Sequence, residues 1–137
     1  MRTAIDTNIL STLWSNEAAA IDVAQQLGDA RSFGALLISP VVYAELLAYP
    51  KATESFVNGF LADTGITVDF EIAEIVWVDA GRRFAHYADQ HRKAGHGAPR
   101  RLLADFLIGA HALLQADRLM SLDATRYKQY FPELKLV

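Results

Sequence analysis

The sequence contains no cysteine and no long apolar run. Without cysteine no disulfide can form, which excludes the disulfide-stapled class of small secreted domains and fits a reducing compartment. The longest segment free of Lys, Arg, Asp and Glu is Ser32–Ala44, with 13 residues, whereas a membrane-spanning helix needs about 20 apolar residues. The N-terminus also lacks the apolar core of a signal peptide. We therefore expect a soluble, cytoplasmic protein with no membrane partner.

The composition is that of an ordinary globular chain. Its 137 residues are 52% hydrophobic and carry a net charge of −3, and a chain of about 150 residues buries nearly 70% of its unfolded surface. No internal repeat, low-complexity tract or linker interrupts the sequence, which predicts one domain over residues 1–137. The negative net charge argues against a nucleic-acid partner unless the basic residues are gathered in one place.

Short apolar runs alternate with segments of helical spacing along the whole chain. This alternation predicts an α/β fold with a short central parallel β-sheet flanked by α-helices. Ligands bind such sheets at the carboxyl ends of the strands. We expect strands at 3–5, 35–38, 66–68, 119–120 and 134–137, and helices at 9–27, 40–48, 53–63, 71–94, 102–115 and 124–130.

Four acidic residues stand in apolar surroundings or directly after a strand. Asp6 follows the first predicted strand, Glu45 is isolated in a long uncharged segment, Asp105 opens the most apolar helix, and Asp123 follows the fourth strand. Each has a structural explanation, because Asp6 and Asp123 can cap helices, Asp105 can favour a helix dipole, and Glu45 can face solvent. An isolated carboxylate in an apolar segment is nevertheless costly unless it is paired or bound to a cation.

Considered together, these acids indicate a metal site. Asp6 and Asp123 are expected at the carboxyl edge of the sheet, and Asp105 begins a helix near the same edge. Oxygen-only ligands favour Mg²⁺ or Mn²⁺. Zinc is not indicated, since cysteine is absent, the three histidines of 86–96 are five residues apart, and His111 falls in a buried helix as a hydrogen-bonded core residue.

Four motifs follow one another along the chain: Asp6-Thr7-Asn8 after the first strand, Pro40 to Glu45, the helix segment 105–112, and Ser121-Leu122-Asp123. Their order and spacing resemble those of PIN-domain ribonucleases, and in particular the VapC toxins of prokaryotic toxin–antitoxin pairs. The resemblance covers nearly the whole chain, and the final motif has Ser where the family often has Thr.

This resemblance implies an endoribonuclease that hydrolyses RNA phosphodiester bonds with Mg²⁺ or Mn²⁺. It makes Asp6, Glu45, Asp105 and Asp123 both the catalytic residues and the metal ligands, with Glu45 either a ligand or a base that orients water. It also implies a homodimer that is neutralised by a cognate antitoxin protein. Residues expected to hold the carboxylates or the phosphate by hydrogen bonds are Asn8, Ser121 and Thr7.

Basic residues are concentrated in one stretch. Residues 82–101 contain 6 of the 13 Lys and Arg residues and a single acid. Arg92 and Lys93 are explained equally well as cations near a helix C-terminus, whereas Arg100 and Arg101 stand one helical turn before Asp105. We expect these four residues to bind RNA.

The partner and the function class have alternatives at this point. Six apolar residues could line a groove for an antitoxin helix or could belong to the core. The chain could also be a PIN nuclease of housekeeping RNA processing that has no antitoxin, or a non-catalytic RNA- or protein-binding PIN module. Retention of all four acids argues against the non-catalytic module. The six apolar residues are Trp14, Tyr43, Leu46, Leu47, Phe56 and Phe60.

Overall fold

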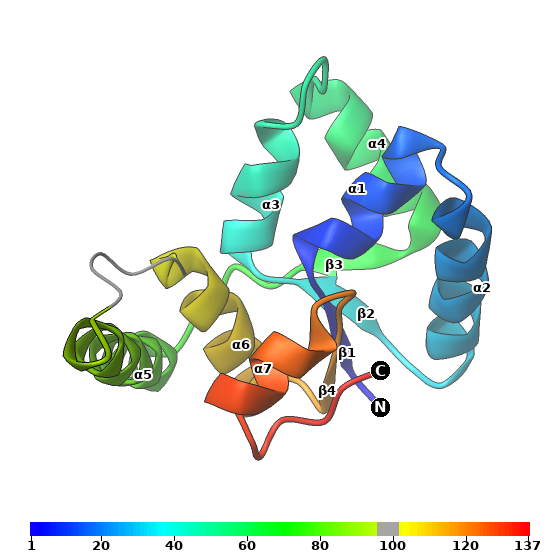
Figure 1. The fold of residues 1–137 in the computed structure, drawn as a ribbon. Coiled ribbons are helices and arrows are strands. Elements are labelled where there is room, and N and C mark those ends of the chain that lie inside the picture. The colour runs from blue at the N-terminus through cyan, green and yellow to red at the C-terminus, as the bar shows by residue number, and fades with distance from the viewer. Residues whose placement is uncertain (96–101) are drawn as a thin grey trace.

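A sheet of parallel strands lies at the centre of the protein (Figure 1). The computed structural model describes residues 1–95 and 102–137. Within them the strand order is β3-β2-β1-β4, and each neighbouring pair is parallel. This arrangement confirms the predicted α/β fold. The strands are β1 (Thr3–Ile5), β2 (Leu36–Ile38), β3 (Ile66–Val68) and β4 (Arg118–Met120).

Helices cover the sheet on both sides. In Figure 1, α5, α6 and α7 lie to the left of the strands, α2 lies to their right, and α1, α3 and α4 lie above them. No helix of the described residues is long and apolar enough to cross a membrane. The helices are α1 (Thr7–Ser15), α2 (Ala19–Ser32), α3 (Pro40–Leu47), α4 (Glu54–Thr64), α5 (Glu74–Lys93), α6 (Leu103–Gln115) and α7 (Ala124–Tyr130).

Local signals explain where several helices begin and end. Ser39 caps α3, because its hydroxyl accepts a hydrogen bond from the Val42 N–H at 3.3 Å, and Pro40 follows at the first helical position. Thr53 caps α4 in the same way. Gly65 ends α4 with φ of 72°, a left-handed conformation that favours glycine.

Two of the expected elements are wrong. The helix expected over 9–27 is two helices, because Asn16 adopts a left-handed conformation with φ of 57° and ends α1. Gly28, directly after the expected end of that helix, lies inside α2. The strand expected over 134–137 is reduced to a single bridge between Leu119 and Leu136.

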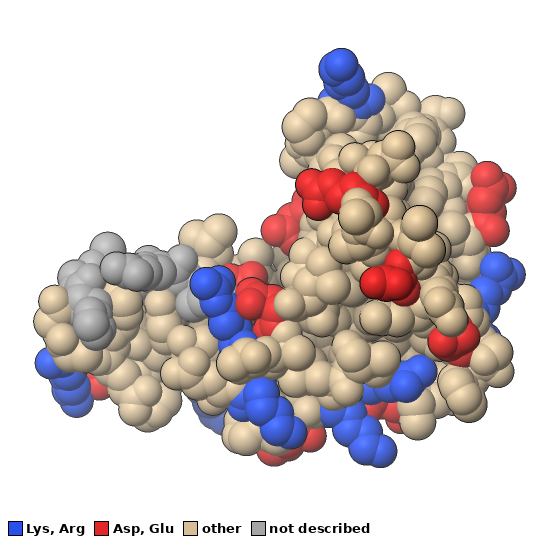
Figure 2. Space-filling model, turned by 45° about the vertical axis from the view of Figure 1, so that its right-hand side comes forward, with Lys and Arg blue, Asp and Glu red and all other residues tan. Residues whose placement is uncertain are grey.

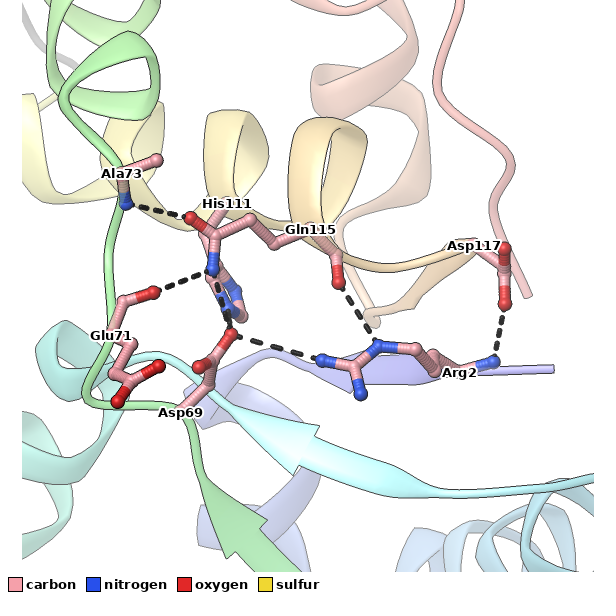
Figure 3. A network of polar contacts seen from close by, with 7 residues as sticks. All are labelled: Arg2, Asp69, Glu71, Ala73, His111, Gln115 and Asp117. Carbon is pink, nitrogen blue, oxygen red and sulfur yellow. Dashed lines mark hydrogen bonds and ion pairs between the residues drawn. The ribbon is translucent and has the colours of Figure 1, made fainter.

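A polar network anchors the C-terminal half of α6 to the sheet (Figure 3). Asp69, directly after β3, has its Oδ2 atom 3.0 Å from His111 Nε2 and accepts a hydrogen bond from Gln115 Nε2 at 2.9 Å. Gln115 also accepts one from the Ala73 N–H, and Arg2 pairs with Asp69 at 3.9 Å. His111 is 1% exposed, so it is the hydrogen-bonded core residue that its helix predicts.

Gly109 supplies a test of how tightly α6 is packed. A Cβ at this position would lie 2.6 Å from Phe131 Cζ. The Phe131 ring is also in contact with the Arg83 guanidinium, which lies 4.5 Å from the ring centre. Because the ring has little room to move, Gly109→Ala should lower the free energy of unfolding by about 1–3 kcal/mol. Denaturant unfolding followed by circular dichroism measures the change.

Gly59→Ala is the matched control and should raise the free energy of unfolding by about 0.5–1 kcal/mol, because α4 leaves open space there. Equal effects would contradict the packing argument.

His111 should make stability depend on pH. Burial lowers the pKa of His111, although Asp69 beside it acts in the opposite direction. The unfolded chain therefore takes up a proton near the ordinary histidine pKa of about 6.5 while the folded protein does not, and the free energy of unfolding falls as the pH drops below that value. In unfolding measured between about pH 7.5 and pH 5, His111→Gln should lose less stability than the wild type. His86→Gln, at an exposed position, should lose as much as the wild type. A loss in His111→Gln as large as in the wild type would contradict this role.

Candidate active site

The candidate site lies where the strand order changes direction. From β1 the chain passes to β2 on one side of the sheet, whereas β4 pairs with β1 on the other side. In open parallel sheets such a reversal leaves a crevice at the carboxyl ends of the two strands, where ligands bind. The Asp6 N–H donates to the Met120 carbonyl oxygen at 3.0 Å. This bond extends the pairing of β1 with β4 and brings Asp6 beside Ser121.

Asp6 is the most enclosed of the four predicted carboxylates, with 6% of its surface exposed. It caps α1, because one oxygen accepts a hydrogen bond from the Thr7 N–H at 2.8 Å. Its other oxygen accepts a hydrogen bond from the Ser121 hydroxyl, also at 2.8 Å. The capping role considered for Asp6 is therefore present, and it does not exclude a chemical one.

The pKa of Asp6 is raised, chiefly because burial disfavours the charged carboxylate. The hydrogen bonds from Ser121 and Thr7 act in the opposite direction, as does the Tyr127 hydroxyl, and the negative charge of Asp105 raises the pKa further. Tyr127 is absent from the residues predicted from the sequence. It is buried on α7 and follows Asp123 by one helical turn, a spacing that could have identified it.

Ser121 and Asn8 connect the ends of β1 and β4. The Ser121 hydroxyl oxygen accepts hydrogen bonds from the Asp123 N–H at 2.9 Å and from Asn8 Nδ2 at 3.4 Å. The side-chain oxygen of Asn8 accepts one from the Leu122 N–H at 3.1 Å. Two side chains from segments far apart in sequence therefore fix the backbone that leads to Asp123.

Glu45 reaches the site from the exposed face of α3. Its Oε1 atom accepts a hydrogen bond from the Thr7 hydroxyl at 2.6 Å. Thr7 also donates its N–H to Asp6, so one residue contacts two of the predicted carboxylates. The structure thus gives Thr7 more contacts with the predicted acids than the sequence suggested.

Asp105 and Asp123 are half-buried and lie at the starts of two helices. Asp105 accepts a hydrogen bond from the Leu102 N–H at 3.3 Å in the first turn of α6, a placement that the helix dipole favours. Asp123 forms an ion pair with Arg126 at 3.6 Å, one turn later on α7. The charge of Asp105 acts on Asp6, whereas the structure orients Asp123 toward a cation of its own helix.

The acids surround the site without closing on a common centre. Figure 2 shows a hollow in the surface with acidic side chains on its wall. Among residues 1–95 and 102–137, no three carboxylate or imidazole side chains lie close enough together to hold one metal ion as they stand. A divalent cation would nevertheless reduce the repulsion between Asp6 and Asp105. The side chains of the site offer only oxygen donors, which Mg²⁺ and Mn²⁺ prefer.

The residues predicted to bind RNA are only partly described. Arg100 and Arg101 lie outside the described residues. Arg92 and Lys93 are exposed at the end of α5 and pair with Asp89 at 3.6 Å and 3.0 Å. These pairs fit the explanation that both cations stabilise the helix C-terminus.

The six apolar residues considered as an antitoxin groove divide between core and surface. Leu46 is fully buried in the core. Trp14 instead lies edge-to-face against Tyr49, Phe56 and Phe60, with ring centres 5.2–5.3 Å apart. Phe56 is 51% exposed, and a pocket of about 190 Å³ opens beside Trp14. Tyr43, Leu47 and Phe60 are partly buried against the core.

Three solved structures share this fold over nearly their full lengths. VapBC-1 from nontypeable Haemophilus influenzae is 23% identical, with 100% of this chain and 97% of that chain covered and a TM-score of 0.67. VapBC2 from Rickettsia felis, bound to a DNA fragment from its promoter, is 19% identical, with coverage of 100% and 98% and a TM-score of 0.66. A toxin–antitoxin complex from Klebsiella pneumoniae is also 19% identical, with coverage of 98% and 95% and a TM-score of 0.66.

The family of the chain follows from a comparison of its sequence with family models. No curated protein sequence matches the chain. The model of the PIN domain, in contrast, matches residues 3–131. That range runs from β1 through α7 and therefore contains Asp6, Glu45, Asp105 and Asp123. Because the match extends over nearly the whole chain, this protein belongs to the PIN-domain family.

Proposed function

We propose that the protein is a VapC-type toxin, an endoribonuclease that hydrolyses RNA phosphodiester bonds with Mg²⁺ or Mn²⁺ and is neutralised by a cognate antitoxin. One observation carries the proposal: a buried Asp6 carboxylate at the reversal of the strand order is held by Ser121 and faces the charge of Asp105. The three similar structures support it, since they are of VapBC or toxin–antitoxin proteins.

The carboxylates of the site fit a hard divalent cation. Asp6 and Asp105 are the proposed direct ligands, with Glu45 and Asp123 completing the set. Carboxylate oxygens are the donors that Mg²⁺ and Mn²⁺ prefer. A cation would favour the charged form of Asp6, whose pKa is raised chiefly by burial and further by the charge of Asp105. Such an ion, when bound, lowers the pKa of a coordinated water and neutralises charge on the phosphate oxygens.

The chain's own residues orient the reacting groups. Ser121 and the Thr7 N–H each occupy one Asp6 oxygen and so fix the carboxylate plane. The Thr7 hydroxyl holds Glu45 at the rim, where an exposed carboxylate can accept a proton from the attacking water. Burial excludes bulk water from Asp6, which strengthens its interaction with a cation.

The surface beside Trp14 is the proposed binding site of the antitoxin. Phe56 is exposed there and a pocket of about 190 Å³ opens beside Trp14, so an apolar helix of a partner would cover a surface that is otherwise in water. The cytoplasmic location and the homodimer belong to the same proposal. A housekeeping nuclease would instead show no growth rescue by a neighbouring gene product.

Asp6→Asn and Asp105→Asn test the function directly. Each should reduce metal-dependent cleavage of RNA by at least about a hundredfold, because either change removes a proposed ligand. Each should also abolish the rise in Tm that Mn²⁺ causes in the wild type, since a metal stabilises only the state that binds it. Asp22→Asn, on the exposed face of α2, is the control, and circular dichroism reports the fold. Full activity in either site variant would reject this assignment.

Ser121→Ala should shift the pH dependence of cleavage. The Ser121 hydroxyl stabilises the Asp6 carboxylate and opposes the rise in its pKa, so its loss raises that pKa and moves the acid limb of the pH–rate profile to higher pH. A drop of about 10- to 100-fold in metal affinity is expected as well. Ser121→Thr keeps the hydroxyl and should retain the wild-type profile. An unchanged acid limb in Ser121→Ala would contradict the role.

A further inference from the structure

Arg126 lies beside the candidate site and is held only loosely there. It stands on α7, three residues after Asp123, and its Nη1 atom lies 3.6 Å from Asp123 Oδ2. The Arg126 side chain is 63% exposed. Within residues 1–95 and 102–137 its guanidinium takes part in this ion pair and in no hydrogen bond. Because a guanidinium has five N–H donors, most of the bonding capacity of Arg126 is available to a group outside the chain.

Arg83 shows how an arginine with a structural role is bound in the same protein. Its guanidinium donates to Asp79 at 2.9 Å, to Glu133 at 2.7 Å and to the Tyr130 carbonyl oxygen at 2.8 Å. Its side chain is 20% exposed. Arg126 has a single partner at a longer distance, and an exposed ion pair of that kind contributes little to stability. The contribution of Arg126 to the fold is therefore small.

A chain of contacts connects Arg126 with the buried carboxylate of the site. The Ser121 hydroxyl donates to Asp6 at 2.8 Å and accepts a hydrogen bond from the Asp123 N–H at 2.9 Å. The Arg126 N–H donates to the Asp123 carbonyl oxygen at 3.1 Å, which fixes the backbone from which the arginine side chain extends. Figure 2 shows basic and acidic side chains next to each other at the hollow. The Arg126 guanidinium thus lies at the border of the acidic site.

The charge of the site gives a cation at this border a function. Carboxylates surround the site, and their negative charge repels a phosphate group. Arg126 can leave Asp123 at little cost, because the side chain is exposed and the ion pair is weak. A divalent cation on Asp123 would favour this departure further, since like charges repel each other. The planar guanidinium can then bind two oxygens of one phosphate through parallel hydrogen bonds.

We propose that Arg126 exchanges Asp123 for a phosphate group of the RNA strand that binds at the acidic site. There its positive charge draws the backbone toward the carboxylates and stabilises the negative charge that grows on the phosphate oxygens during cleavage. This inference rests on the proposed function and adds to it a substrate-binding residue. The residues predicted from the sequence to bind RNA lie at 92–93 and 100–101, and none of them is on α7.

Arg126→Ala should weaken the binding of RNA and its dependence on salt. In EDTA, which prevents cleavage, fluorescence anisotropy with a labelled unstructured RNA should show affinity reduced about three- to tenfold. The plot of log K against log salt concentration should become shallower by about 0.7, the value for one phosphate contact of a single strand. Arg126→Lys keeps the charge and should keep the slope, but it should recover the affinity only in part because it lacks the planar guanidinium.

Lys128→Ala is the matched control. Lys128 is exposed on the same helix, two residues after Arg126 and therefore on the opposite side of α7. Its removal changes the net charge by the same amount, and both the affinity and the slope should stay at their wild-type values. An unchanged slope in Arg126→Ala, or an equal change in Lys128→Ala, would overturn the contact.

Mn²⁺ binding in the absence of RNA distinguishes a substrate contact from support of the acidic site. In a calorimetric titration Arg126→Ala should bind Mn²⁺ at least as tightly as the wild type, because loss of a neighbouring positive charge favours a cation on Asp123. If Arg126 instead held Asp123 in place, its removal would weaken Mn²⁺ binding. That result would overturn the proposal.

Cleavage assays separate this proposal from the proposed nuclease function. In Mn²⁺ the kcat/KM of Arg126→Ala should fall about tenfold, whereas Lys128→Ala should match the wild type. A wild type that binds RNA through Arg126 but cleaves none would overturn the nuclease function and leave the contact standing. A wild type that cleaves RNA as fast as Arg126→Ala does would overturn the contact and leave the nuclease function standing.

Discussion

The burial of one carboxylate beside the carboxyl ends of β1 and β4 is the constraint on which the site depends. A charge taken out of water costs several kcal/mol unless it is paired or hydrogen-bonded. Asp6 meets this cost with bonds from the Thr7 N–H and the Ser121 hydroxyl, and the bond from Ser121 requires β1 and β4 to be neighbours. The strand order thus serves the chemistry as well as the core. Asp105 then adds a repulsion that hydrogen bonds alone do not remove.

The position of Asp105 depends on contacts along the whole of α6. The Asp69–His111 and Asp69–Gln115 contacts fix its C-terminal half (Figure 3), and Gly109 allows the helix to approach Phe131 closely. The first turn is left to present its carboxylate toward Asp6. Because a helix is stiff over three turns, contacts in the second half of α6 set the position of its first turn.

Features that depend on near neighbours in sequence could be predicted from it. The cap at Ser39, the stop at Gly65 and the apolar strands are of this kind, and so is the position of Asp6 directly after β1. The break at Asn16 was missed because asparagine adopts the left-handed conformation only in some contexts. The Thr7–Glu45 bond and the effect of Tyr127 on Asp6 join distant segments, and no local pattern encodes which buried hydroxyl faces which acid.

The shortness of the strands has a consequence for mutational scanning. Each strand has three residues, so β1 spans about 10 Å from one edge of the sheet to the other. Ile5 belongs to the core, yet it directly precedes Asp6 of the candidate site. A library that reports only growth or cleavage would therefore score core and site substitutions in β1 and β4 alike. Separating the two requires the amount of folded protein to be measured for every variant, whereas exposed Glu45 can be scored by activity alone.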